Sequence, residues 1–187
     1  MGKKKNQVIE AIYSRRSVRD YSDKPVPKEI VEELLNAAVM APSARNTQPW
    51  NFSIVQDRET IDKLGDKAAE MRGMLGKGLK AGLRLAGKGT IFYNAPLLIV
   101  ISGKTGYDYL KDDVNLAVQN MFLAAHSLGL GSCWIGLAKP LNKDPASMKE
   151  LGIPSDMEIV APLIFGYPKK QDKSIPKRKP IILKWIK

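Results

Sequence analysis

The side chains in this sequence that are best suited to binding a ligand are cationic and lie near its two ends. The stretch RRSVR places three guanidinium groups and one hydroxyl where a short predicted helix ends: Arg15, Arg16, Ser17 and Arg19. The stretch PKRKP near the C-terminus adds three more cations: Lys177, Arg178 and Lys179. A guanidinium group matches phosphate oxygens with two parallel hydrogen bonds, so both stretches are suited to a phosphate. Viewed alone, each stretch is more often a solvated surface than a binding site.

The net charge of +11 is confined to the same two ends. Residues 1–24 contain seven Lys or Arg and three acidic residues, residues 169–187 contain eight and one, and residues 25–168 contain fifteen of each. If the two ends converge on one anion, a single phosphate explains this distribution. Basic tails also occur in nucleic-acid-binding proteins. The neutral middle and the lack of aromatic residues among the basic runs argue against that function, so we expect no nucleic-acid partner.

A third candidate is the polar segment APSARNTQPW, residues 41–50, between a predicted helix and a predicted strand. Five side chains with hydrogen-bonding groups lie between its two prolines: Ser43, Arg45, Asn46, Thr47 and Gln48. Such residues are common in surface turns. The composition therefore leaves open whether the segment is a simple turn or a binding loop.

Residues for nucleophilic or metal catalysis are scarce. His126 and Cys133 are the single histidine and the single cysteine of the chain, and such a pair cannot form a zinc site. A Cys–His nucleophile pair would need a third orienting group, so a buried structural histidine is the favoured interpretation. No G-x-S-x-G, H-E-x-x-H or Walker A motif occurs, and the glycine-rich stretches do not follow the Rossmann order. Hydrolase chemistry is therefore disfavoured.

The elements that position these residues follow from hydrophobic periodicity. Helical spacing predicts helices over 6–14, 27–40, 58–73, 112–131 and 144–152, with Asp57 as an N-cap and Gly129 at a left-handed C-terminal position. Apolar runs predict strands over 50–56, 95–102, 132–137 and 158–167. This order predicts a single α+β domain, residues 1–187, with a mixed central sheet flanked by helices.

Two further segments are harder to place. The tail IILKWIK, residues 181–187, is strand-like but has no neighbouring hairpin partner, so its partner must lie elsewhere in the sheet or on another subunit. Residues 73–89 contain many glycines among basic and apolar residues, and we interpret them as a mobile helix or lid. No run is long enough to cross a bilayer and no signal-peptide core follows the N-terminus, so we expect a cytoplasmic protein with no membrane partner.

Five stretches in this order resemble the nitroreductase family of flavin-dependent oxidoreductases. They are SRRSVRDYSDKPVP, AAVMAPSARNTQPWNF, NAPLLIVI, DDVNLAVQNMFLAAHSLGLGSCWIG and the basic arm near the C-terminus. The similarity spans residues 8 to about 179 and is weakest over 57–90. The resemblance implies an intertwined homodimer with C-terminal arm exchange and one FMN in each of two interface sites.

The resemblance also implies roles for individual residues. The FMN phosphate and ribityl chain would be held by Arg15, Arg16, Ser17 and Arg19, aided by Lys177, Arg178 and Lys179. The partner subunit would contribute Pro42, Ser43, Ala44 and Asn46, with Leu116 packing nearby. The flavin ring would be lined by Cys133, Trp134, Ile135 and Gly136, where a backbone N–H could bond the hydride-accepting nitrogen.

A flavin performs hydride transfer itself, so no catalytic side chain and no metal is required. We expect NADH or NADPH to drive two-electron reduction of small electron-poor acceptors, such as nitroaromatics or quinones, with ping-pong kinetics. The alternatives are a specialised flavoenzyme of the same fold (an enone reductase, a dehalogenase or a flavin-fragmenting enzyme) and, from another class, a nucleic-acid-binding module.

Overall fold

The computed structural model describes residues 6–73, 89–170 and 177–187 of the chain. Its helices are α1 (Gln7–Ser14), α2 (Lys28–Val39), α3 (Arg58–Met71), α5 (Leu110–Ser127) and α6 (Pro145–Glu150), with 3₁₀ segments η1 (Ala44–Asn46) and η2 (Gly136–Lys143). Its strands are β1 (Asn51–Val55), β2 (Leu97–Lys104), β3 (Gly131–Trp134) and β4 (Met157–Gly166). The predicted helices and strands are confirmed, with small shifts at their ends. The lid predicted over 73–89 falls almost entirely outside the described residues.

The four strands form one sheet in the order β1-β2-β4-β3, and every neighbouring pair is antiparallel. The α+β class is confirmed, but the mixed sheet is wrong for these strands. Helix α5 is a crossover between β2 and β3, which run in the same direction, and β4 inserts between them and pairs with both. The order of helices and strands along the chain did not indicate this insertion. The parallel contact in the described part is an isolated bridge between Ser17 and Ser132.

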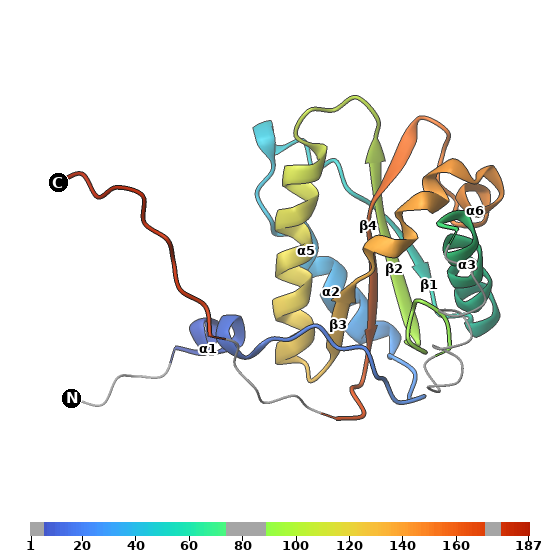
Figure 1. Cartoon of the computed structure of the whole chain (residues 1–187), viewed down its shortest axis with the longest axis horizontal. Helices are drawn as coiled ribbons and strands as arrows, with labels where there is room; N and C mark the ends of the chain where they lie inside the picture. The colour runs from blue at the N-terminus through green and yellow to red at the C-terminus, as the bar shows by residue number, and fades with distance from the viewer. Residues whose placement is uncertain (1–5, 74–88, 171–176) are drawn as a thin grey trace.

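Helices cover both faces of the sheet (Figure 1). On one face, α2 and α5 pack over Leu97, Ile99 and Ile101 of β2. On the other face, α3, η2 and α6 cover Leu98 and Val100. Because side chains of a strand alternate between faces, a sheet covered on both sides needs apolar residues throughout, as the predicted core strands have.

Two segments stand apart from this core. Helix α1 buries none of its residues, and the C-terminal residues 177–187 extend away from the body as an arm (Figure 1). The arm exposes its apolar side chains, with Trp185 73% exposed, and forms no strand with the described part of this chain. The sheet position predicted within the same chain is therefore not occupied. No helix among the described residues is both long and apolar enough to span a bilayer.

The helix ends follow the predicted local rules. Asp57 caps α3, because its carboxylate accepts a hydrogen bond from the Thr60 N–H at 2.8 Å. Gly129 has a φ of 76° just after α5, the left-handed conformation that glycine adopts without strain. Both predictions are confirmed.

Candidate functional site

The RRSVR segment follows the outer edge of β3. The N–H of Val18 donates to the Ser132 carbonyl at 3.0 Å, next to the parallel bridge between Ser17 and Ser132. A Cβ on Gly131 would lie 2.7 Å from the Val18 Cβ, so this close approach depends on glycine. The edge strand thereby holds the backbone on which the four predicted phosphate-binding residues lie.

Two of these arginines are anchored by neutral groups. The Arg15 guanidinium carbon lies 5.7 Å from the centre of the Phe122 ring on α5, a cation–π contact. Arg16 donates from Nη1 to the carbonyls of Tyr13 at 2.7 Å and Arg15 at 2.6 Å, which caps the end of α1. Ser17 and Arg19 are exposed to solvent.

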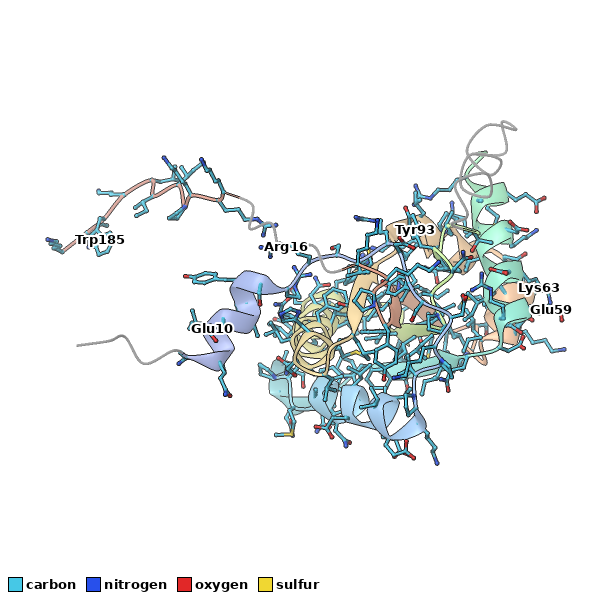
Figure 2. The ribbon with its side chains drawn as sticks, turned by 90° about the horizontal axis from the view of Figure 1, so that it is seen from below. Glu10, Arg16, Glu59, Lys63, Tyr93 and Trp185 are labelled. Carbon is cyan, nitrogen blue, oxygen red and sulfur yellow. The ribbon has the colours of Figure 1, made fainter. Side chains whose placement is uncertain are left out.

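The positive charge of the C-terminal arm influences Arg15 near the other end of the chain. Burial lowers the pKa of Arg15, and the nearby positive charges of Arg16 and Arg178 lower it further. Figure 2 shows Arg16 at the junction of α1 with the body of the molecule, and Trp185 far out along the arm. Within the described residues Arg15 forms no ion pair with a carboxylate. This concentration of positive charge is suited to an anion.

Lys177 and Lys179 flank Arg178 and are exposed. Their side chains make no ion pair with the described residues. The structure therefore links the arm to the basic cluster through Arg178. We call Arg15, Arg16 and Arg178 the basic cluster.

His126 lies beside the basic cluster, and the sequence did not identify this position. It is half-buried rather than buried, and its Nε2 lies 2.7 Å from the Ser14 Oγ. The Ser14 hydroxyl donates its proton to the Glu10 carbonyl at 2.6 Å, so the His126 Nε2–H is the donor to Ser14. Burial first, and then the charges of Arg15 and Arg16, lower the pKa of His126. Phe122 and His126 are one helical turn apart, so they lie on the same face of α5. This spacing was the sequence signal that could have placed His126 near Arg15, which packs on Phe122.

Cys133 lies in β3 with its thiol packed into the core, and the residue is 1% exposed. Burial raises the pKa of Cys133, although Arg19, a hydrogen bond with Ser17 and Arg15 oppose the shift. The thiol donates to the Trp134 carbonyl at 3.6 Å. Because its side chain is enclosed, any contact of Cys133 with a ligand on the edge of β3 would be through the backbone.

The chain leaves the sheet after Trp134, the last residue of β3, at the predicted ring-binding position. Trp134 is half-buried, with Lys139 Nζ 5.9 Å from its ring centre. The Ile135 N–H already donates to the Pro162 carbonyl at 2.9 Å. A Cβ on Gly136 would meet no atom within 4 Å, so this residue borders open space.

Arg72 supports this turn, and sequence reasoning missed it. Its guanidinium donates to the Gly136 carbonyl at 2.9 Å and to the Leu137 carbonyl at 3.1 Å. Two donors on consecutive carbonyls fix the start of η2. The contact spans two segments far apart in the chain, so no local pattern could have shown it.

The polar loop 41–50 is tied to the start of α5. The Ala44 N–H donates to the Asp113 Oδ1 at 3.0 Å, and the Tyr107 hydroxyl lies 3.2 Å from Asp113 Oδ2. The Gln48 N–H donates to the Ser43 Oγ at 3.0 Å, which closes the loop on itself. Pro42 and Asn46 are exposed. These hydrogen bonds, within the loop and to α5, give the loop a defined conformation.

The loop and the basic cluster of one chain are separated along α5. Asp113 holds the loop, and Phe122, nine residues later, lies under Arg15. At 1.5 Å per residue, nine residues correspond to about 14 Å along the helix axis. Leu116 lies between them and is 47% exposed. Within one chain, the residues of loop 41–50 lie together and the residues of the basic cluster lie together. The loop and the basic cluster themselves are not joined into one site within that chain.

Comparisons with known proteins identify the family of this chain. The model of the nitroreductase family matches residues 12–167. The chain belongs to this family. A protein of Archaeoglobus fulgidus whose name provisionally assigns it as an NADH dehydrogenase/NAD(P)H nitroreductase is 34% identical over 170 residues, which cover 88% of this chain and 87% of that protein. Human iodotyrosine deiodinase 1 is 30% identical over 202 residues, covering 97% of this chain and 68% of that enzyme.

Solved structures of nitroreductases share the fold. A nitroreductase of Bacteroides fragilis with bound FMN is 30% identical and has a TM-score of 0.76, with 98% of each chain covered. A nitroreductase of Desulfitobacterium hafniense with bound FMN has a TM-score of 0.83 at 24% identity, covering 97% of this chain and 100% of the other. Because the identity to the Desulfitobacterium hafniense protein is low, that similarity supports a shared fold and nothing more.

Proposed function

We propose that this nitroreductase-family protein is an FMN-dependent oxidoreductase that uses NADH or NADPH to reduce small electron-poor acceptors, such as nitroaromatics or quinones. The observation that carries the proposal is the position of Arg15 and Arg16, which follow α1 beside the edge of β3, with the charge of Arg178 near enough to lower the pKa of Arg15. Residues from opposite ends of the chain concentrate positive charge there without a carboxylate ion pair to Arg15 in the described part. A phosphate group satisfies such a cluster, because guanidinium groups bind phosphate through charge-assisted hydrogen bonds.

The residues present fit FMN at both of its ends. The basic cluster, with Ser17 and Arg19, would hold the phosphate, while the turn at Gly136 would face the ring. FMN supplies hydride-transfer chemistry when bound. The chain's own contribution is to hold, orient and stabilise the charge of the cofactor, which agrees with the scarcity of acid–base residues in the sequence.

The choice of the backbone N–H that donates to the flavin ring can be narrowed to one residue. The Ile135 N–H is engaged with Pro162, so it is not the donor. Gly136 is the first residue of η2, and the first amides of a helical turn have no acceptor within it. Gly136 also borders open space, so its N–H is the best candidate. The hold of Arg72 on the Gly136 carbonyl would keep this peptide oriented.

The second half of the site is proposed to come from a second copy of the chain. Loop 41–50 and the basic cluster lie at different positions along α5, and the exposed Leu116 lies between them. The arm and α1 expose apolar side chains that one chain does not cover, as expected for an intertwined homodimer with arm exchange. Ser43 and Asn46 of one subunit would then meet a cofactor held by the basic cluster of the other.

Reductive dehalogenation is the second candidate. It is favoured by the similarity to iodotyrosine deiodinase 1, which extends over 97% of this chain. Both candidates use the same cofactor and the same cofactor-binding residues. They differ in the acceptor, so steady-state assays with nitroaromatics, quinones and halogenated phenols would distinguish them.

The test begins with the absorption spectrum of the purified protein. We expect a yellow protein with a flavin band, followed by bleaching on anaerobic titration with NADH or NADPH. A colourless protein that takes up no added FMN would refute the proposal. Light scattering should give the mass of a dimer, and a flavin-bound monomer would contradict the shared site.

A further inference from the structure

Loop 41–50 rests on a buried carboxylate that belongs to a different element. We propose that Asp113 is a positioning residue for the cofactor, because it holds the loop backbone from which Ser43 and Asn46 project. The inference rests on the proposed function, since positioning matters only if this loop contacts FMN. Asp113 itself touches no reacting group and acts through Ala44 and Tyr107.

The burial of Asp113 is unusual for its place in the chain. It lies in the first turn of α5 and is 4% exposed, whereas the preceding residue, Asp112, is exposed. Within the described residues no cation forms an ion pair with Asp113. A buried carboxylate is costly unless its oxygens accept hydrogen bonds. Asp113 meets this need with Ala44 and Tyr107, together with the favourable field at a helix N-terminus.

The loop itself requires outside support. Arg45, Asn46 and Gln48 have φ values of 54°, 55° and 48°, so three non-glycine residues lie in the left-handed region. Such conformations are unfavourable and persist only where surrounding contacts determine them. Asp113 holds Ala44, the residue just before this run. The Tyr107 hydroxyl, which also lies 2.8 Å from the Thr47 Oγ1, holds a residue within the run.

This support leaves a defined set of groups for the cofactor. The Ala44 N–H is committed to Asp113, so it cannot serve the flavin at the same time. The Ser43 Oγ accepts from the Gln48 N–H, and the Asn46 Oδ1 accepts from the Gln48 Nε2 at 3.3 Å. Within the described residues the Ser43 hydroxyl proton and the Asn46 amide protons have no acceptor, so they are the donors that the loop presents. Flavin ring oxygens and nitrogens are matching acceptors.

Three variants of the full-length FMN-bound protein test the inference. Asp113→Ala removes both hydrogen bonds, whereas Asp113→Asn keeps them, because an amide can accept from Ala44 and donate to the Tyr107 oxygen. Tyr107→Phe keeps the hydrogen bond between Ala44 and Asp113, but it removes the hydrogen bond to Asp113 Oδ2 and the link to Thr47. The matched control is Asp112→Asn, which changes the exposed carboxylate one residue earlier.

We expect Asp113→Ala to weaken FMN binding on the order of tenfold and to change the visible circular dichroism of the bound flavin. Asp113→Asn should restore both properties, Tyr107→Phe should be intermediate, and Asp112→Asn should match the wild type. If Asp113→Ala does not fold, the same comparison is made with Tyr107→Phe.

Two results would overturn the inference, and they are distinguishable. If the wild type binds FMN and the variants lower only the melting temperature, with unchanged FMN affinity and flavin dichroism, Asp113 is merely structural. If the wild type and Asp112→Asn also bind no FMN, the proposed function fails as well.

Discussion

The basic cluster and loop 41–50 are two halves of one proposed site, but they are built in opposite ways. The basic cluster lies next to segments with little burial of their own: α1, which ends just before Arg15, buries none of its residues, and the arm that carries Arg178 is exposed. The loop is tied to a buried carboxylate and contains three left-handed residues. The cluster therefore combines two arginines anchored beside β3 with a cation from the exposed arm, whereas the loop provides few donors in a defined geometry.

This contrast indicates where each half is sensitive. Affinity for an anion tolerates movement, because charge interactions fall off slowly with distance. Hydrogen bonds to a flat ring do not tolerate such movement, because they weaken steeply as the donor–hydrogen–acceptor angle departs from linear. We therefore expect the cluster to determine how tightly the cofactor is retained, and the loop to determine how its ring is oriented.

Removal of the arm should have the largest effect. Deletion of residues 177–187 removes Arg178 and the exposed apolar side chains, so it should weaken FMN binding on the order of a hundredfold and shift the protein toward monomer. Flavin content and light scattering measure the two effects. The control is Lys184→Ala, which keeps the arm and Arg178. A truncated dimer that retains stoichiometric FMN would contradict the role of the arm.

Substitution of Arg15 should separate binding from stability. Arg15→Ala should weaken FMN binding by roughly tenfold to thirtyfold, because one charge-assisted contact is lost. The unfolding free energy should fall by only about 1 kcal/mol, the scale of a cation–π contact with Phe122. Lys149→Ala on the exposed surface of α6 is the control. Equal losses of FMN affinity in both variants would mean that net charge alone matters.

Two glycines allow each half to be displaced separately. Gly131→Ala would push against Val18 and move the RRSVR segment, whereas Gly103→Ala would place a Cβ 2.7 Å from the Pro49 carbonyl oxygen and against Leu110. Overpacking of this kind costs about 2 kcal/mol of unfolding free energy. We expect Gly131→Ala to lower FMN affinity and Gly103→Ala to alter the flavin dichroism. If both variants gave the same pattern, the division between retention and orientation would be wrong.

The smallest expected effect is the dependence of protein stability on pH that His126 causes. The pKa of His126 in the folded protein lies below its ordinary value of 6.5, so the unfolded chain binds the proton more tightly. The stability of the cofactor-free protein should therefore be highest above pH 6.5 and fall as the pH drops through the folded pKa. His126→Gln keeps a donor to Ser14 and should abolish this dependence. Denaturant unfolding from pH 5 to 8 measures it, and an unchanged slope in the variant would exclude His126 as the cause.

Local patterns predicted the elements well, because helix and strand periodicity depends on near neighbours. The bounds of α1, α2, α3 and β4 were predicted within about three residues, as were the Asp57 cap and the Gly129 position. The antiparallel sheet was not predicted, because nothing local indicates that β4 inserts between β2 and β3. The assignment of site residues to FMN stays a prediction from the resemblance.

The amino-acid sequence was sufficient to indicate the family, the confinement of charge to the two ends and the polar character of loop 41–50. Folding was needed to reveal that the charge of Arg178 acts on Arg15, that His126 joins Ser14 and that Asp113 holds Ala44. Residue types and periodicity are properties of short stretches of chain. Contacts between residues that are distant in the chain depend on how the helices pack on the sheet, and these contacts define the geometry of the proposed site.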